Sequence, residues 1–234
     1  MSEWWTYRLS DFLMFSSETY FGLFELYHRS IWPLQFAALL AGIVILFCLL
    51  RQPVWSGRAV ALILAAAWIW VGWAFQLEHY ATINWGAKWF AALFAAGALV
   101  LFWSGVIRDH LQLARITDRR QWPGVILFLS AFLAYPPAAV LAGRSWVEME
   151  LFALTPDATA IGTMGILLCT RKRTPIVPLV FALLWCAISG STLWTMRSPE
   201  AWVVAVAAVV GLASLLLRRI RVGSTSGADQ RRVE

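Results

Sequence analysis

Residues 155–170 read TPDATAIGTMGILLCT, and this stretch decides how the chain folds. It opens with Thr155, Pro156 and Asp157, residue types that favour the cap and first turn of a helix. After them it carries no charge up to Thr170. A helix rises about 1.5 Å per residue, so a helix over this stretch is about 24 Å long, against about 30 Å for a bilayer core. The stretch is therefore a short candidate for a membrane span.

The composition of the whole chain requires lipid as its solvent. Apolar types make up 60% of the 234 residues and charged types only 14%, whereas a soluble domain carries about a quarter charged residues. Fifteen tryptophans also favour a membrane protein, because tryptophan gathers at membrane–water boundaries. Six further stretches without Lys or Arg are long enough to cross a bilayer. They are Pro33–Leu50, Ala59–Leu77, Trp89–Ile107, Pro123–Ala142, Pro175–Thr195 and Ala201–Leu217.

The distribution of basic residues decides whether residues 155–170 cross. If they do, the connections place 14 Lys and Arg on one side and five on the other. If they do not, the split becomes 7 inside and 12 outside, which reverses the bias expected for cytoplasmic loops. The sequence therefore predicts an all-α membrane protein with seven transmembrane helices, the N-terminus outside and the C-terminus inside. The same insertion rule accounts for the net charge of +6, so we expect no nucleic-acid partner.

Three regions follow from this pattern. Residues 1–30 form an amphipathic segment on the outer face, residues 31–220 form the seven-helix domain, and residues 221–234 form a flexible cytoplasmic tail. Within the first region, Ser17–Arg29 is typical of an interfacial helix, with Trp4 and Trp5 helping to anchor it. Its apolar stripe comprises Tyr20, Leu23, Phe24, Tyr27 and Ile31.

Three predicted spans are irregular in the same outer half. Pro136 and Pro137 interrupt the fourth span, and the fifth is short. The sixth carries small and hydroxyl residues over 189–192. Either these features only kink and pack the helices, with hydroxyls bonded to their own helix, or they line an outward-open cavity. Short and interrupted segments mark binding sites in transporters, although no paired halves are visible here.

If a cavity is present, its lining follows from helix geometry. The substrate-binding candidates come from the outer ends of spans two, three, five and six: Glu78, His79, Asn84, Asp157, Trp185, Ser189 and Thr192. A second set forms a polar rim on the same side: Glu25, His28, Arg29, Tyr80 and Glu150. The rim is either a solvated surface or a part of the site. The carboxylate of Asp157 offsets the partly positive helix end, which favours a neutral or cationic solute.

Signatures of catalysis, metal binding and cofactor binding are missing from the sequence. We find no GxSxG, HExxH, Walker, GxGxxG or CxxC motif. Glu25 and His28 share a helix face, but a single such pair is weak evidence for a metal site. Cys48, Cys169 and Cys186 lie in apolar runs, which makes a disulfide framework unfavourable. We therefore predict no catalytic residues, no metal and no cofactor.

Several strings resemble a bacterial family of multi-span membrane proteins of unknown function. They are Trp4–Tyr7 with Leu9–Phe12, Glu25–Tyr27, Tyr80–Trp85 and Leu184–Gly190. The resemblance covers the chain up to its tail and implies a protein of the bacterial inner membrane. Some members of that family are labelled as permeases of the major facilitator type. That label fits poorly, because those transporters have repeated halves and this chain has seven predicted spans.

The leading functional hypothesis is a protein that binds or transports a small solute through an outward-facing pocket. The first alternative is an accessory or assembly subunit that docks a membrane-protein partner or a second copy of the chain. The second is a membrane enzyme that uses carboxylates and histidines of the outer face, although the missing motifs argue against it.

Overall fold

A computed structural model describes residues 15–116, 119–171 and 174–230, with side chains up to Leu217. Within these ranges the chain forms helices joined by turns and irregular segments, with one isolated β-bridge between Leu113 and Thr170. The α-helices are α1 (Ser17–Ser30), α2 (Leu34–Arg51), α3 (Ser56–Trp70), α4 (Ala87–Leu101), α5 (Trp122–Leu129), α6 (Tyr135–Leu141), α7 (Pro156–Leu168), α8 (Ile176–Thr195) and α9 (Glu200–Gln230). The short helices are η3 (Val71–Leu77), η4 (Tyr80–Thr82), η5 (Phe102–Ile107), η6 (Arg119–Gln121), η7 (Ser130–Ala134) and η8 (Trp146–Glu148).

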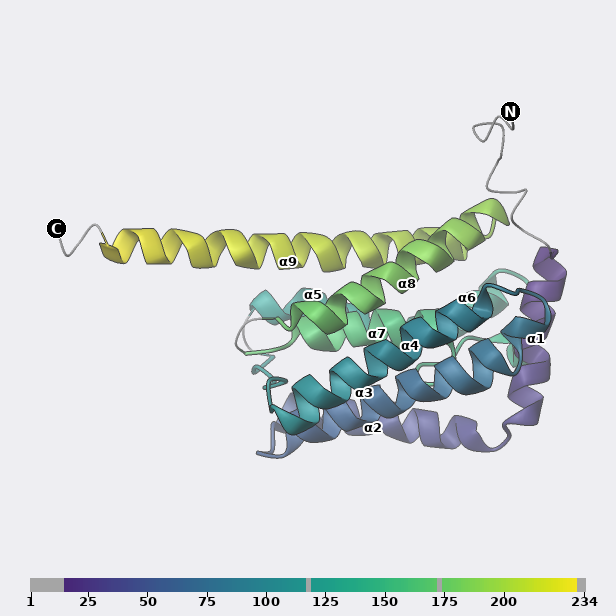
Figure 1. The fold of residues 1–234 in the computed structure, drawn as a ribbon, viewed down its shortest axis with the longest axis horizontal. Coiled ribbons are helices and arrows are strands. Elements are labelled where there is room, and N and C mark those ends of the chain that lie inside the picture. The colour runs from purple at the N-terminus through teal and green to yellow at the C-terminus, as the bar shows by residue number, and fades with distance from the viewer. Residues whose placement is uncertain (1–14, 117–118, 172–173, 231–234) are drawn as a thin grey trace, which may run out of the picture.

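The helices form one elongated bundle with α1 across one end (Figure 1). Helices α2 to α9 run along the bundle, and α9 continues past the end opposite to α1. We call the end covered by α1 the α1 end. Six helical segments are long and apolar enough to cross a membrane: residues 34–51, 56–82, 87–107, 119–141, 176–195 and 200–217. They correspond to six of the seven predicted spans.

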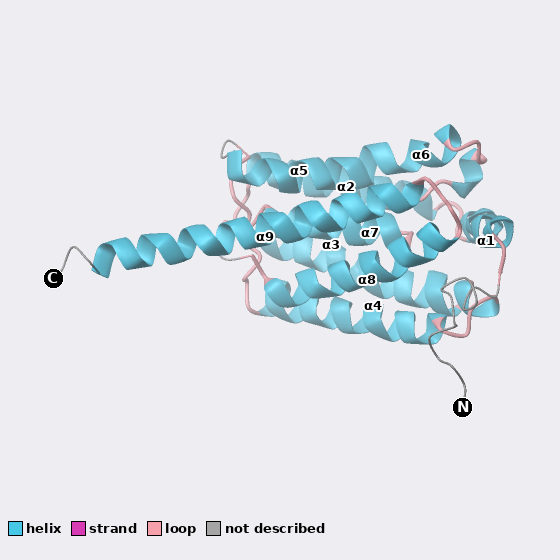
Figure 2. Ribbon diagram, turned by 90° about the horizontal axis from the view of Figure 1, so that it is seen from above, coloured by secondary structure: helices cyan, strands magenta, loops and turns pink. Residues whose placement is uncertain are grey.

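Helix α7 corresponds to the remaining predicted span, the fifth, and lies in the middle of the bundle (Figure 2). It has 13 residues and every one of them is buried, whereas only 28% of the apolar window of α2 is buried. Its length is about 20 Å. Irregular chain extends it at both ends, namely the segment 149–155 before it and residues 169–171 after it. The position of α7 is therefore that of a core helix, shielded by its neighbours from the surroundings of the bundle.

The backbone at both ends of α7 finds hydrogen-bond partners in the protein. At the α1 end, the Thr155 amide donates to the Leu151 carbonyl at 2.9 Å, and the Tyr27 hydroxyl donates to the Leu154 carbonyl at 2.9 Å. At the other end, the Ala114 amide donates to the Cys169 carbonyl at 2.8 Å. Non-helical backbone is tolerated at membrane depth only when it is satisfied in this way.

The prolines predicted to interrupt the fourth span follow a wider turn of helix. Pro136 and Pro137 have no amide hydrogen to donate, and the π-helical η7 stands directly before them, between α5 and α6. Two other π-helical segments, η3 and η5, end the spans that α3 and α4 begin. The bundle thus accommodates the prolines with a local change of helical pitch.

Helix α1 agrees with the predicted amphipathic pattern. Tyr20, Leu23, Phe24 and Tyr27 are all buried, and the Ser16 side chain caps the helix by accepting from the Thr19 amide at 3.2 Å. On the opposite face Arg29 pairs with Glu25 at 2.6 Å. The apolar stripe of α1 is packed against protein, including a Phe24–Phe75 ring contact at 4.9 Å. The anchors Trp4 and Trp5 lie outside the described residues.

Helix α9 continues into the region from residue 221 that the sequence analysis assigns to a flexible tail. Helix α9 runs without a break to Gln230 and includes Gly223 and Gly227. The backbone of residues 221–230 is therefore helical. Residues 231–234 lie outside the described part of the chain.

Candidate functional site

The Asp157 carboxylate is buried at the α1 end, where it accepts hydrogen bonds from three side chains. Thr155 caps α7 and Pro156 opens it, which places Asp157 in the first turn. The Trp185 indole and the Ser189 hydroxyl each donate to it at 2.7 Å, and the Tyr135 hydroxyl donates at 3.2 Å. Trp185 and Ser189 lie four residues apart on α8 and so point in one direction. Hydrogen bonds of this kind hold a carboxylate in a fixed orientation.

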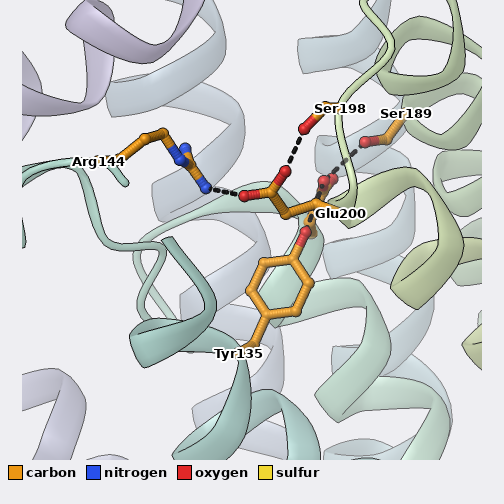
Figure 3. Close-up of polar contacts among 6 residues, drawn as sticks. Tyr135, Arg144, Ser189, Ser198 and Glu200 are labelled. Atoms are coloured by element: carbon orange, nitrogen blue, oxygen red, sulfur yellow. Dashed lines mark hydrogen bonds and ion pairs between the residues drawn. The ribbon is translucent and has the colours of Figure 1, made fainter. Parts of the chain in front are cut away.

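A second acid, Glu200, lies close to this group and is paired with an arginine. Arg144, in the turn after α6, contacts Glu200 in the first turn of α9, and Ser198 donates to the same carboxylate. Figure 3 shows Arg144 and Ser198 pointing at Glu200, with the hydroxyls of Tyr135 and Ser189 directed to the neighbouring carboxylate. The Arg144 guanidinium also lies 3.9 Å from the centre of the Phe21 ring. The pair therefore joins α1, α6 and α9.

A third acid, Glu150, is buried without such partners. It is 1% exposed; its carboxylate oxygens have no hydrogen bond of normal geometry from the described residues, and the Thr155 hydroxyl is the side-chain donor that stabilises its charge. Burial raises the pKa of Glu150 well above its ordinary value, and the nearby Asp157 and Glu200 carboxylates raise it further, while Arg144 opposes them. Glu150 therefore favours its neutral form far more than an exposed glutamate does.

An open pocket of about 440 Å³ at the α1 end has one of these acids, Glu200, in its wall. It is formed by the first turn of α1, the turn after α6 with η8, and the turn between α8 and α9. Its charged lining residues are Glu18, Arg144, Glu148, Arg197 and Glu200. Arg144 and Glu200 thus belong both to the pocket wall and to the buried polar group behind it. We call the pocket, Glu150 and Asp157 together the α1-end site.

The structure brings together three of the seven predicted binding residues, Asp157, Trp185 and Ser189. The other four lie apart from this group. Thr192 donates back to the Ile188 carbonyl at 3.0 Å, and the Asn84 side chain accepts from the Gly86 amide at 2.9 Å. Glu78 is exposed. His79 bonds the Ala74 carbonyl at 2.8 Å.

The predicted rim residues divide between the surface and the interior. Glu25 and Arg29 form an ion pair with the arginine largely exposed. Tyr80, His28 and Glu150 are buried. One ring nitrogen of His28 bonds the Val147 carbonyl at 2.7 Å. Burial lowers the pKa of His28, and the Val147 bond opposes that shift. The rim is therefore a solvated surface only in part.

Sequence reasoning missed Arg144, Glu200 and Tyr135. The sequence did hold a signal for Arg144. It is one of only five basic residues on the predicted outer side, and it follows Gly143 at the end of a predicted span. Glu200 stands at the start of the last span. Their pairing depends on two turns that are 56 residues apart in the chain. Within the described residues, no three His, Cys, Asp or Glu side chains gather closely enough to hold a metal ion.

The comparisons with known proteins place the chain in a family. Residues 17–226 match the model of a family of unknown function, DUF6064, and the chain therefore belongs to that family. The match covers α1 and nearly all of α9, so the α1-end site lies entirely within the family domain. No curated protein matches the chain. No solved structure matches it either.

Proposed function

We propose that this member of the DUF6064 family crosses the membrane seven times, with the α1 end outside, and binds a small cationic solute in the α1-end pocket. As the sequence resemblance implies, the membrane would be the inner membrane of a bacterium. Transport of the bound solute is the wider function that we infer. The observation that carries the proposal is the open pocket of about 440 Å³, whose lining holds the three acids Glu18, Glu148 and Glu200.

Two observations support the proposed topology: the placement of α7 inside the bundle and the distribution of Lys and Arg between its two ends. Six long helices meet the length requirement for crossing. Helix α7 is short, but the irregular chain at both of its ends lengthens it inside the bundle, where its backbone groups are satisfied. With α7 as a crossing segment, the side opposite to α1 carries 14 of the 19 Lys and Arg. This bias favours a cytoplasmic location for that side. Helix α1 would then lie along the outer interface.

The preference for a cation rests on the charges at the site. The lining holds three acids, Glu18, Glu148 and Glu200, against two arginines, Arg144 and Arg197. Asp157 adds a further carboxyl group close enough to Glu200 for their charges to interact. Arg144 and Glu200 neutralise each other as an ion pair. The remaining charged lining residues are two acids and one arginine, so the net charge that a ligand meets is negative. A pocket of this charge concentrates cations and repels anions.

Thiol chemistry tests this proposal in the purified full-length protein. The three native cysteines are buried, so a single cysteine at Ser17, in the pocket lining, supplies the reporter. We expect S17C to react several-fold faster with a cationic methanethiosulfonate than with an anionic one, relative to a small free thiol. Tetramethylammonium should slow the labelling, and potassium at equal ionic strength should not.

The matched control is T82C, because Thr82 is exposed and is not part of the pocket lining. Tetramethylammonium should leave its labelling unchanged. Equal rates for both reagents at position 17, without protection, would contradict a cation site. The alternative of an accessory subunit, docking a partner protein or a second copy, would then become the leading one.

A further inference from the structure

Three exposed arginines lie at the end of the bundle opposite to α1, on elements that pack side by side (Figure 1). Arg51 ends α2, Arg58 stands in the first turn of α3, and Arg108 follows η5. Helix α3 contacts both α2 and η5. A Cβ added at Gly57 would lie 2.2 Å from the Leu111 carbonyl oxygen, so the start of α3 packs directly on the chain that follows η5. We call Arg51, Arg58 and Arg108 the arginine patch.

Two of these arginines continue exposed apolar stripes along their helices. On α2, Arg51 stands four residues after Phe47, so the two side chains share a face of the helix. On α3, Arg58 stands four residues before Leu62 and shares a face with it in the same way. Phe47 and Leu62 are both exposed. In a membrane such faces meet acyl chains, so Arg51 and Arg58 stand at the polar end of lipid-facing surfaces.

The third arginine, Arg108, lies over an exposed aromatic ring. Its guanidinium carbon is 5.4 Å from the centre of the Trp103 ring, and Trp103 and Ile107 are exposed. Trp55, in the turn that joins α2 to α3, is exposed as well. Exposed tryptophans of membrane proteins gather at the level of the lipid headgroups. The arginine patch therefore lies where acyl chains give way to headgroups.

The arginine patch keeps a net positive charge. The acid beside it is Asp109, whose carboxylate lies 3.7 Å from the Nε of Arg58. The two side chains of this pair are 60% and 42% exposed, and an ion pair as exposed as this one is weak. Three arginines and one acid leave a charge of +2. Positive charge at the headgroup level attracts anionic lipids.

We propose that the arginine patch binds one anionic phospholipid from the leaflet at that end of the bundle. The lipid phosphate accepts hydrogen bonds from the guanidinium groups, whose planar fork matches phosphate geometry. The acyl chains lie along the exposed stripes of α2 and α3. A lipid fits this surface better than a soluble anion does, because only a lipid covers the apolar stripes together with the charges. The inference is independent of the α1-end pocket, which lies at the other end of the bundle.

Native mass spectrometry of the full-length protein in detergent with added lipid tests this site. Phosphatidylglycerol is the anionic probe, and phosphatidylethanolamine with the same acyl chains is the reference. We expect the wild type to retain one phosphatidylglycerol with an affinity several-fold above that for the reference. R51Q/R58Q/R108Q should lose this preference, because each arginine near a membrane surface contributes about fivefold. Glycerol phosphate, which has the phosphate without the chains, should not displace the lipid.

The matched control is R115Q/R119Q/R171Q, which removes three exposed arginines from other elements of the same end and should keep the preference. Thermal unfolding without added lipid checks that both triple variants fold. If the patch variant does not fold, R51Q and R108Q replace it, each with about fivefold weaker binding, because both leave the Arg58–Asp109 pair intact.

Three results would overturn the proposal. The first is a wild type without preference for phosphatidylglycerol. The second is an equal loss in the patch variant and the control, which would mean a diffuse attraction by all the charges of this end. The third is displacement of the lipid by glycerol phosphate, which would mean a phosphate site that does not use the apolar stripes.

Discussion

At the scale of single residues, three acids of the α1-end site have different surroundings. Asp157 receives three hydrogen bonds, and Glu200 is paired with Arg144. Glu150 is buried with neither. The first arrangement fixes a carboxylate as part of the structure, the second balances its charge, and the third leaves a group whose protonation can change. We therefore assign Asp157 a positioning role at the site.

Removing a donor to Asp157 should destabilise the protein. The Ser189 hydroxyl donates to this buried carboxylate at 2.7 Å, and a hydrogen bond to a charged group contributes about 1.5–3 kcal/mol. We expect S189A to lower the free energy of unfolding by about this amount, measured by denaturant titration in detergent. T192A is the control, because the Thr192 hydroxyl bonds only its own helix and its loss should cost far less. If S189A and T192A lowered the free energy of unfolding equally, the hydrogen bond to Asp157 would contribute no more than a bond within one helix.

Residue-level prediction from the sequence worked where helix geometry alone decides proximity. Trp185 and Ser189 share a face of α8, and Asp157 stands in the first turn of the preceding predicted span, so their meeting follows from topology. Asn84 and Thr192 carry equally polar groups, but local backbone acceptors and donors satisfy them. The contact of Arg144 with Glu200 joins two separate turns. Only the packed bundle specifies it.

At the scale of elements, α7 is held by close approach of its neighbours. A Cβ added at Gly165 would lie 2.5 Å from the Phe128 amide nitrogen, and one at Gly162 would lie 2.6 Å from the Phe152 ring. Small residues allow helices to approach in this way. The glycines of α7 thus allow α5 and the segment 149–155 to pack directly on its backbone.

Alanine substitution tests this packing. We expect G165A to destabilise the protein by more than the 1–3 kcal/mol typical of overpacking, because the nearest atoms at this site are backbone and cannot rotate away. G190A in α8 is the matched control, since its new Cβ would meet only Val204 at 3.6 Å. At position 190 the higher helix propensity of alanine should offset any small packing cost, so G190A should be about as stable as the wild type. Thermal unfolding of the wild type and of both variants measures these changes in stability. If G165A were tolerated as well as G190A, α7 would not be tightly packed.

The sequence predicts element positions better than element details. All six long helical segments overlap the predicted stretches closely, because their apolar runs end at charged turns. The π-helical segments η3, η5 and η7 had no comparable signal except the prolines that follow η7. Their pitch depends on how each helix meets its neighbours. The continuation of α9 beyond Gly223 was also not predicted, since glycine and serine there favour irregular chain.

At the scale of the whole molecule, the outer surface of the bundle is apolar and its interior carries the charges of the α1-end site. Helix α2 exposes Phe36, Leu40, Ile43, Phe47 and Leu50. Helix α9 similarly exposes Val206, Val209 and Leu217. Asp157 and Glu150 are instead buried. This reversal of the pattern of a soluble protein agrees with a lipid environment.

The central claim is that α7 crosses the membrane and places the α1-end site outside. Impermeant maleimide labelling of single cysteines in intact cells measures this most directly, with S145C before α7 and R171C after it, because both positions are exposed. The account predicts that S145C is labelled in intact cells and that R171C is labelled only after permeabilisation. Labelling of both positions in intact cells, or of neither until permeabilisation, would put the two ends of α7 on one side and contradict the account.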